Sequence, residues 1–130
     1  MTDDAPFHAH IYFTDPDRAR AIELHGRFRG LTDREAHPRI FYTGQMAEGP
    51  VGPHPLPQFE VHFLAGERAE VVALIAAAGL RALVHPLTDD DLADHTTLAQ
   101  WTGQPLELDL SVLDPPGVNQ GRRRFGNTDF

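Results

Sequence analysis

The sequence predicts an α+β sandwich, in which a β-sheet carries helices on one face. Three observations lead to this prediction. Short stretches of strictly alternating apolar and polar residues indicate strands that are buried on one side. Two stretches with apolar residues at helical spacing lie between them. The order along the chain is strand, helix, strand, strand, helix, strand, and the length of 130 residues predicts one domain.

The first strand is predicted at residues 7–13, Phe-His-Ala-His-Ile-Tyr-Phe. Because side chains alternate between the two faces of a strand, the four apolar residues would face the core while His8, His10 and Tyr12 face the other way. Two histidines at i and i+2 can share one divalent metal if a neighbouring strand supplies a further ligand. The first strand therefore suggests a metal site that other strands must complete.

The next elements follow from helix signals and strand propensity. A helix is predicted over residues 16–29, with Asp15 as N-cap, Pro16 at the first helical position and Gly30 at its end. Residues 39–43 are rich in β-branched and aromatic side chains, which favours a second strand.

A stiff loop precedes the third strand. Residues 48–57 contain four prolines and two glycines, which excludes a helix or a central strand. The loop carries His54, either as a functional group held in place or as part of a purely structural turn. Alternation returns at residues 58–64, where Glu60 and His62 share the polar face.

The second half of the chain repeats the pattern. Gly66 and Gly79 bound a predicted helix, and residues 81–85 form a strand that stops at Pro86. The resulting βαββαβ order is that of ferredoxin-like folds. We expect the spatial strand order 4-1-3-2, with strands 1 and 3 parallel and strand 4 antiparallel on the other flank of strand 1.

This topology predicts that four histidines converge at one end of the sheet, on the face without helices. They are His8, His10, His54 and His85. His62, at the far end of the third strand, is expected to lie apart. A lone strand histidine is more often structural, but four that converge favour a functional site. Glu60 is the best carboxylate candidate, with an exposed or salt-bridged glutamate as the alternative.

The histidine face must be covered by a partner subunit or by the C-terminal segment. In that segment Thr88 is predicted to cap a short helix whose carboxylates, Asp89 to Asp91, indicate a solvated helix start. Alternation over residues 106–110 predicts a fifth, edge strand. The folded domain is thus expected at residues 1–114, and a polar, flexible tail at 115–130.

Composition narrows the chemistry. The formal net charge of −8 argues against nucleic acid or an anionic membrane as the main partner, and the basic run at residues 122–124 is interpreted as part of the solvated tail. No long apolar run or basic leader is present, which predicts a cytoplasmic protein. The chain has no cysteine, so a metal would need imidazole and oxygen ligands, which suit Fe(II), Zn(II) or copper.

Five motifs, in order along most of the chain, resemble the small DOPA 4,5-dioxygenase family of fungi and bacteria. They are Phe7-His8-Ala9-His10-Ile11-Tyr12-Phe13, Val51-Gly52-Pro53-His54-Pro55, Phe59-Glu60-Val61, Val84-His85-Pro86-Leu87-Thr88, and Asp90-Asp91-Leu92 with Asp94-His95-Thr96. One departure is Asp89, where the family pattern has glycine. The resemblance implies an extradiol ring-cleaving dioxygenase that uses non-haem Fe(II) and O2 on a catechol such as DOPA, in a ferredoxin-like homodimer.

The resemblance points to the motif histidines without saying which of them bind metal. We expect His8, His10 and His85 as metal ligands. Glu60 is the alternative third ligand and otherwise belongs to the catalytic residues. His54 and His95 are then acid/base or substrate-positioning groups. Arg81 or Arg39 would hold the carboxylate of DOPA. The competing hypothesis is a non-catalytic metal- or small-ligand-binding module of the same fold.

Overall fold

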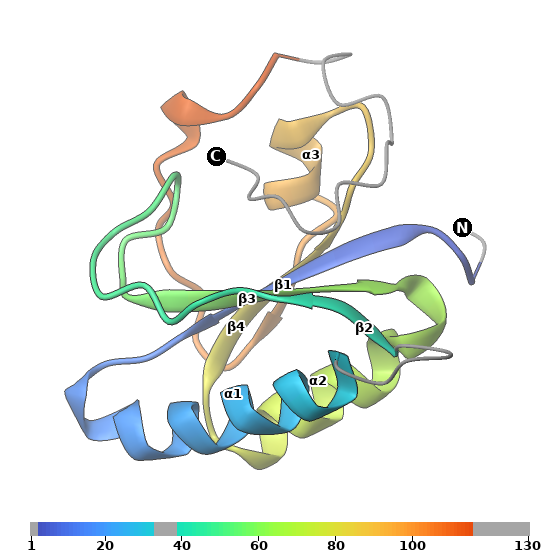
Figure 1. The fold of residues 1–130 in the computed structure, drawn as a ribbon. Coiled ribbons are helices and arrows are strands. Elements are labelled where there is room, and N and C mark those ends of the chain that lie inside the picture. Colours follow the sequence, from blue (N-terminus) through green and yellow to red (C-terminus); the bar gives the residue numbers. More distant parts are fainter. Residues whose placement is uncertain (1–2, 33–38, 116–130) are drawn as a thin grey trace.

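The computed structural model describes residues 3–32 and 39–115 (Figure 1). These residues form five strands and three α-helices, and no helix among them is long and apolar enough to cross a bilayer. Short 3₁₀ helices at residues 15–17 and 65–67 lead into α1 and α2. In chain order the elements are β1 (Pro6–Tyr12), α1 (Arg18–Thr32), β2 (Ile40–Thr43), β3 (Gln58–Leu64), α2 (Arg68–Ala77), β4 (Arg81–Pro86), α3 (Asp91–His95) and β5 (Gln100–Thr102).

The strands form one sheet in the order β2-β3-β1-β4-β5. Figure 1 shows α1 and α2 packed on one face, with α3 and the C-terminal segment over the other. The predicted α+β, ferredoxin-like arrangement and its 4-1-3-2 strand order are therefore confirmed. Of the two covers expected for the histidine face, this chain supplies the C-terminal one.

The predicted direction of β3 was wrong. β1 and β3 are antiparallel, with Pro6 opposite Leu64 and Tyr12 opposite Gln58. The reason is that β2 and β3 are antiparallel neighbours, whereas the crossover through α1 makes β2 run in the same direction as β1. Hence the end of β3, and not its start, lies beside the start of β1 and the end of β4.

The core lies between the sheet and helices α1 and α2. As the alternation predicted, the apolar residues of β1 and β3 are buried in this layer. Phe59 of β3 packs edge-on against Phe28 of α1, with ring centroids 6.4 Å apart, and against His25 at 5.0 Å. This packing fixes the sheet on the helices, so the opposite face of each strand presents its polar residues to α3.

The limits of α1 differ from prediction by a few residues. The helical segment begins with the 3₁₀ helix at residues 15–17, and its N-cap is Thr14 and not Asp15: the backbone N–H and hydroxyl of Thr14 both donate to the carboxylate of Asp17, at 3.2 and 2.9 Å. Gly30 does not end the helix, which continues to Thr32, whose hydroxyl donates to the carbonyl oxygen of Phe28. Thr32 thereby supplies the local bond that closes the last turn.

Two predictions for the C-terminal segment were wrong. The N-cap of α3 is Asp90, whose carboxylate accepts from the Ala93 N–H at 3.0 Å, whereas Thr88 donates to Asp94. The edge strand is β5, paired with β4, and not residues 106–110. That stretch instead runs along the proline-rich loop, where the Asp109 N–H donates to the Pro53 carbonyl at 2.9 Å.

The predicted tail falls almost entirely outside the described residues. Description ends at residue 115, so the expected tail beyond it and its basic run at 122–124 are not placed.

Candidate active site

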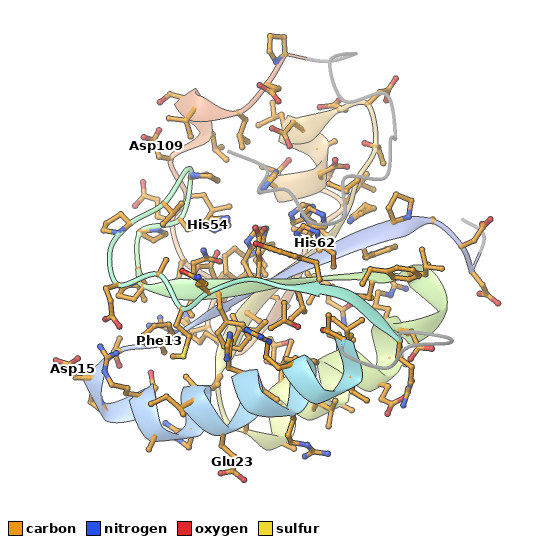
Figure 2. All side chains as sticks on the ribbon, in the orientation of Figure 1. Phe13, Asp15, Glu23, His54, His62 and Asp109 are labelled. Atoms are coloured by element: carbon orange, nitrogen blue, oxygen red, sulfur yellow. The ribbon has the colours of Figure 1, made fainter. Side chains whose placement is uncertain are left out.

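Among the described residues, six imidazoles and the carboxylate of Glu60 lie buried at the sheet face opposite α1 and α2, each at most 3% exposed. In Figure 2, the labelled His54 and His62 project on the side of the sheet that carries α3. The structure thus brings together the four histidines that were expected to converge, and α3 adds a fifth. The buried groups are His8, His10, His54, Glu60, His62, His85 and His95.

His62 belongs to the cluster, contrary to prediction. Because β3 is antiparallel to β1, His62 lies directly opposite His8. Their rings stack with centroids 3.6 Å apart and planes within 4°. The strand register, which residue spacing does not reveal, decides this contact.

His54 reaches the cluster by a different path from the predicted one. The start of β3 faces the end of β1, yet the proline-rich loop turns back over the sheet face. There the ring of His54 lies 4.0 Å from that of His10. The loop is held by the His54 N–H, which donates to the Val51 carbonyl at 3.0 Å, and by the bond from Asp109 to Pro53.

Three rings have a defined proton position. His10 Nδ1 donates to Gln58 Oε1 at 3.2 Å, His85 Nδ1 to the Pro86 carbonyl at 2.8 Å, and His95 Nδ1 to the Asp91 carbonyl at 2.8 Å. A carbonyl oxygen only accepts, so each of these Nδ1 atoms carries the hydrogen. In the neutral rings every Nε2 therefore presents a lone pair.

Two of these lone pairs face each other. His10 Nε2 and His85 Nε2 are 3.0 Å apart, so when both rings carry their hydrogen on Nδ1 a shared cation stabilises the two facing lone pairs. Two nitrogens bound at right angles to one metal at about 2.1 Å would also lie roughly 3.0 Å apart. One ligand atom each from His8, His10 and His85 lies within 4.8 Å of the others. These residues fit a divalent metal.

Glu60 supplies the only carboxylate among the seven buried groups. Its Oε2 lies 3.3 Å from His62 Nε2, 3.9 Å from His10 Nδ1 and 4.0 Å from His8 Nδ1. Within the described part of the chain neither oxygen of Glu60 accepts a hydrogen bond. A buried carboxylate in this setting is stabilised by a cation, either a metal or a protonated imidazole. Of the alternative of an exposed or salt-bridged glutamate, the exposed form is therefore wrong.

Burial governs the acid-base state of the site. Desolvation, reinforced by the neighbouring imidazoles His54, His85, His8 and His95, lowers the pKa of His10 well below its usual value. Desolvation likewise raises the pKa of Tyr12 far above the usual value for a phenol. Both effects keep the groups neutral at physiological pH, which is the state in which His10 can bind a metal.

Sequence reasoning missed three further contributors. Asp91, expected in a solvated turn, is 3% exposed, and its Oδ1 lies 3.4 Å from His95 Nδ1. Gln58 orients His10, and Tyr12 contacts His54. The signal for Gln58 and Tyr12 was present, since both share the period-two face of the histidines. Asp91 belongs to the fifth family motif, but no periodicity indicates its burial, which depends on how α3 docks.

Of the two predicted carboxylate-binding arginines, one is engaged elsewhere. Arg39 forms ion pairs with Glu67 and Glu70, beside the start of α2. Arg81 begins β4 opposite Tyr12 and is half-buried. Arg81 is therefore the better placed of the two for a substrate group.

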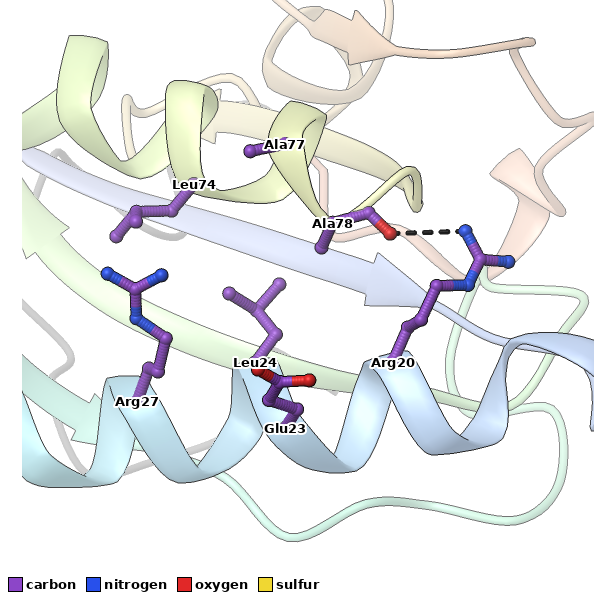
Figure 3. A pocket seen from close by; sticks show the side chains of 7 residues that line it. All are labelled: Arg20, Glu23, Leu24, Arg27, Leu74, Ala77 and Ala78. Atoms are coloured by element: carbon purple, nitrogen blue, oxygen red, sulfur yellow. Dashed lines mark hydrogen bonds between the residues drawn. The ribbon is translucent and has the colours of Figure 1, made fainter.

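Two cavities adjoin the site. One of about 240 Å³ is lined by Tyr42, Gln58 and Glu60 together with residues of the β2–β3 connection, and one of about 570 Å³ lies between His54 and residues 107–110. A third, of about 230 Å³, lies between α1 and α2, where Arg20 donates to the Ala78 carbonyl (Figure 3). The third is on the helix side of the sheet, so it is separate from the histidines.

Comparison with known proteins identifies the family of this chain. Residues 7–112 match the sequence model of the Dopa 4,5-dioxygenase family, and the chain belongs to that family. It is therefore a member of a family of dioxygenases.

Individual relatives extend the comparison. An uncharacterized 21.2 kDa protein of Botryotinia fuckeliana is 33% identical over 117 residues, and a DOPA 4,5-dioxygenase of Amanita muscaria is 31% identical over 113. Each alignment covers 82% of this chain but only 62% and 49% of the respective relative. The crystal structure of a candidate dioxygenase from Nostoc punctiforme matches with a TM-score of 0.69 and 33% identity, over 85% of this chain and 91% of that one.

Proposed function

We propose that the chain is an extradiol dioxygenase that uses non-haem Fe(II) and O2 to cleave the ring of a catechol such as DOPA. The observation that carries the proposal is the pair of Nε2 lone pairs of His10 and His85, buried and 3.0 Å apart. Membership of the Dopa 4,5-dioxygenase family and the named Amanita relative support the reaction class.

His8, His10 and His85 would hold the metal. Their ligand atoms converge, and a nitrogen set without thiolate suits Fe(II) while leaving coordination positions for substrate. Glu60 is the alternative third ligand, because its Oε2 lies 4.0 Å from His8 Nδ1 and its carboxylate can share a metal with His8 and His62. When bound, Fe(II) supplies the centre at which catechol and O2 meet and through which electrons pass between them.

The remaining groups would manage protons and water. A catechol must lose a proton as it binds, and His95 is suited to accept it, because its Nδ1–H donates to Asp91 and leaves Nε2 as an acceptor. Burial under α3 and the proline-rich loop excludes bulk water from the reacting groups. Arg81 is the proposed contact for the carboxylate of an amino-acid catechol.

A homodimer is part of the same proposal. Several large apolar side chains of the C-terminal segment are exposed, which favours an apolar contact there. They are Leu92, Leu98, Leu110 and Val112. Light scattering after size-exclusion chromatography tests it, and a single monomeric mass of 14.4 kDa at all concentrations would contradict it.

The second candidate is a metal- or ligand-binding module without turnover, which the same buried donors would support. Loading the protein with Fe(II) without oxygen and then adding DOPA in air separates the two. The enzyme takes up one O2 per DOPA and forms a yellow ring-opened product, and the Zn2+-loaded protein, with the same ligands but no redox chemistry, does not. Tight Fe(II) binding with no O2 uptake on any catechol would instead support the module.

A further inference from the structure

Tyr12 and His54 form a buried pair that the proposed roles above do not explain. Tyr12 OH lies 2.6 Å from His54 Nδ1, and both residues are 1% exposed. The tyrosine ring also stacks on Trp101 of β5, with centroids 6.1 Å apart. The pair is therefore held from three sides: by β1, by the proline-rich loop and by β5.

Proton accounting fixes the direction of this hydrogen bond. Within residues 3–32 and 39–115, His54 Nδ1 is the one acceptor that the structure places within reach of the Tyr12 hydroxyl hydrogen. If His54 donated instead, that hydrogen would be left buried without an acceptor, which costs about 1–3 kcal/mol. The phenol therefore donates, and Nδ1 of His54 accepts. A neutral His54 then carries its hydrogen on Nε2.

We propose that Tyr12 is a positioning residue that holds His54 as the Nε2–H tautomer, so that His54 is a hydrogen-bond donor in this site and not a metal ligand through Nε2. His54 differs in this from His10, His85 and His95. In those three rings Nδ1–H donates a hydrogen bond to an oxygen acceptor, and Nε2 presents a lone pair.

The catalytic part of this inference rests on the proposed function. One nitrogen of His54 lies within 4.8 Å of nitrogens of His10 and His95, so the ring of His54 borders the cluster. Ring cleavage needs one proton removed from the catechol and one delivered when the O–O bond breaks. His95 would accept the first and, as the imidazolium, return it as the second, while Nε2–H of His54 donates a hydrogen bond to the negative charge that develops on oxygen and both oxygen atoms enter the product. The protons cancel, and O2 is the oxidant that the reaction already uses.

The test is the tautomer of His54, read by long-range ¹H–¹⁵N correlation NMR on ¹⁵N-histidine protein loaded with diamagnetic Zn2+. His54→Gln identifies the His54 signals by their loss. We expect the wild-type protein to show the Nε2–H tautomer and Tyr12→Phe to shift His54 to a mixture or to Nδ1–H. Tyr42→Phe is the matched control, since it removes the hydroxyl of the other tyrosine, which lies against His62, and should leave the His54 tautomer unchanged.

Kinetics provide a second reading. Because loss of a hydrogen bond to the charge that develops in the transition state costs roughly 10²-fold or more in rate, Tyr12→Phe should lower kcat by about that factor at unchanged metal content and KM. An Nδ1–H tautomer in the wild-type protein overturns the inference, as does a Tyr12→Phe variant with the wild-type tautomer. The wild-type spectrum decides even if the variant does not fold. Failure of the proposed function would appear separately, as absent turnover by the wild-type enzyme.

Discussion

Replacing Gln58 with leucine tests whether the hydrogen bond behind His10 prepares that ring for a metal. Gln58 is 3% exposed, and its Oε1 accepts from His10 Nδ1 at 3.2 Å. Leucine has nearly the same size but cannot accept a hydrogen bond. We therefore expect Gln58→Leu to weaken metal binding without disturbing the fold.

The size of the effect follows from where the cost falls. In the metal-free variant His10 can move its hydrogen to Nε2 and donate to His85 Nε2, 3.0 Å away. When a metal occupies Nε2, the hydrogen must stay on Nδ1, where it is buried without an acceptor at a cost of about 1–3 kcal/mol. Since about 1.4 kcal/mol corresponds to a factor of ten, the dissociation constant should rise roughly 5- to 150-fold.

A competition titration of Zn2+ against a chromophoric chelator measures this change without redox complications. The control is Gln104→Leu, the same substitution at an exposed position, which should bind Zn2+ like the wild-type protein. A Gln58→Leu affinity within twofold of wild type would show that the His10 tautomer does not matter to the metal, and the assignment of His10 as a ligand would lose its main support.

Three further outcomes are expected. His85→Ala removes one of the two facing lone pairs, so Zn2+ affinity should fall at least tenfold further than in Gln58→Leu in the same titration; an unchanged affinity would move the metal elsewhere. Phe59→Ala should lower the free energy of unfolding in urea by about 3–5 kcal/mol, because the ring is fully buried, whereas exposed Leu98→Ala should change it by about 0.5 kcal/mol or less. The metal-free protein should lose stability below about pH 6.5. There His10 becomes protonated in the unfolded chain but stays neutral in the folded protein, because burial lowers its pKa in the folded state. The loss for His10 is up to about 1.4 kcal/mol per pH unit. His10→Gln should flatten that slope, and equal slopes in the two proteins would contradict the lowered pKa.

The path of the chain was largely predictable because its signals are local. Period-two alternation marks β1 and β3, and helical spacing marks α1 and α2. The prediction of strand direction and pairing failed because these depend on contacts between segments that are far apart in the sequence. The direction of β3 relative to β1 was wrong, and with it the position of His62. The alternation over residues 106–110 predicts an edge strand there, but β5 is the segment that pairs with the free edge of β4.

For the candidate site too, one part was predictable from the sequence and another was not. Alternation alone was enough to put His8, His10 and Tyr12 on one face and Phe7 and Ile11 on the other, since a strand has only two sides.

Which side-chain atoms then meet, and where each proton lies, was decided only by the folded chain. The Pro86 carbonyl accepts from His85 Nδ1 and the Gln58 amide oxygen accepts from His10 Nδ1, so the Nε2 lone pairs of the two rings face each other. A phenol from β1 makes His54 a donor. Such contacts join residues as many as 75 positions apart, and no local pattern in the sequence encodes them.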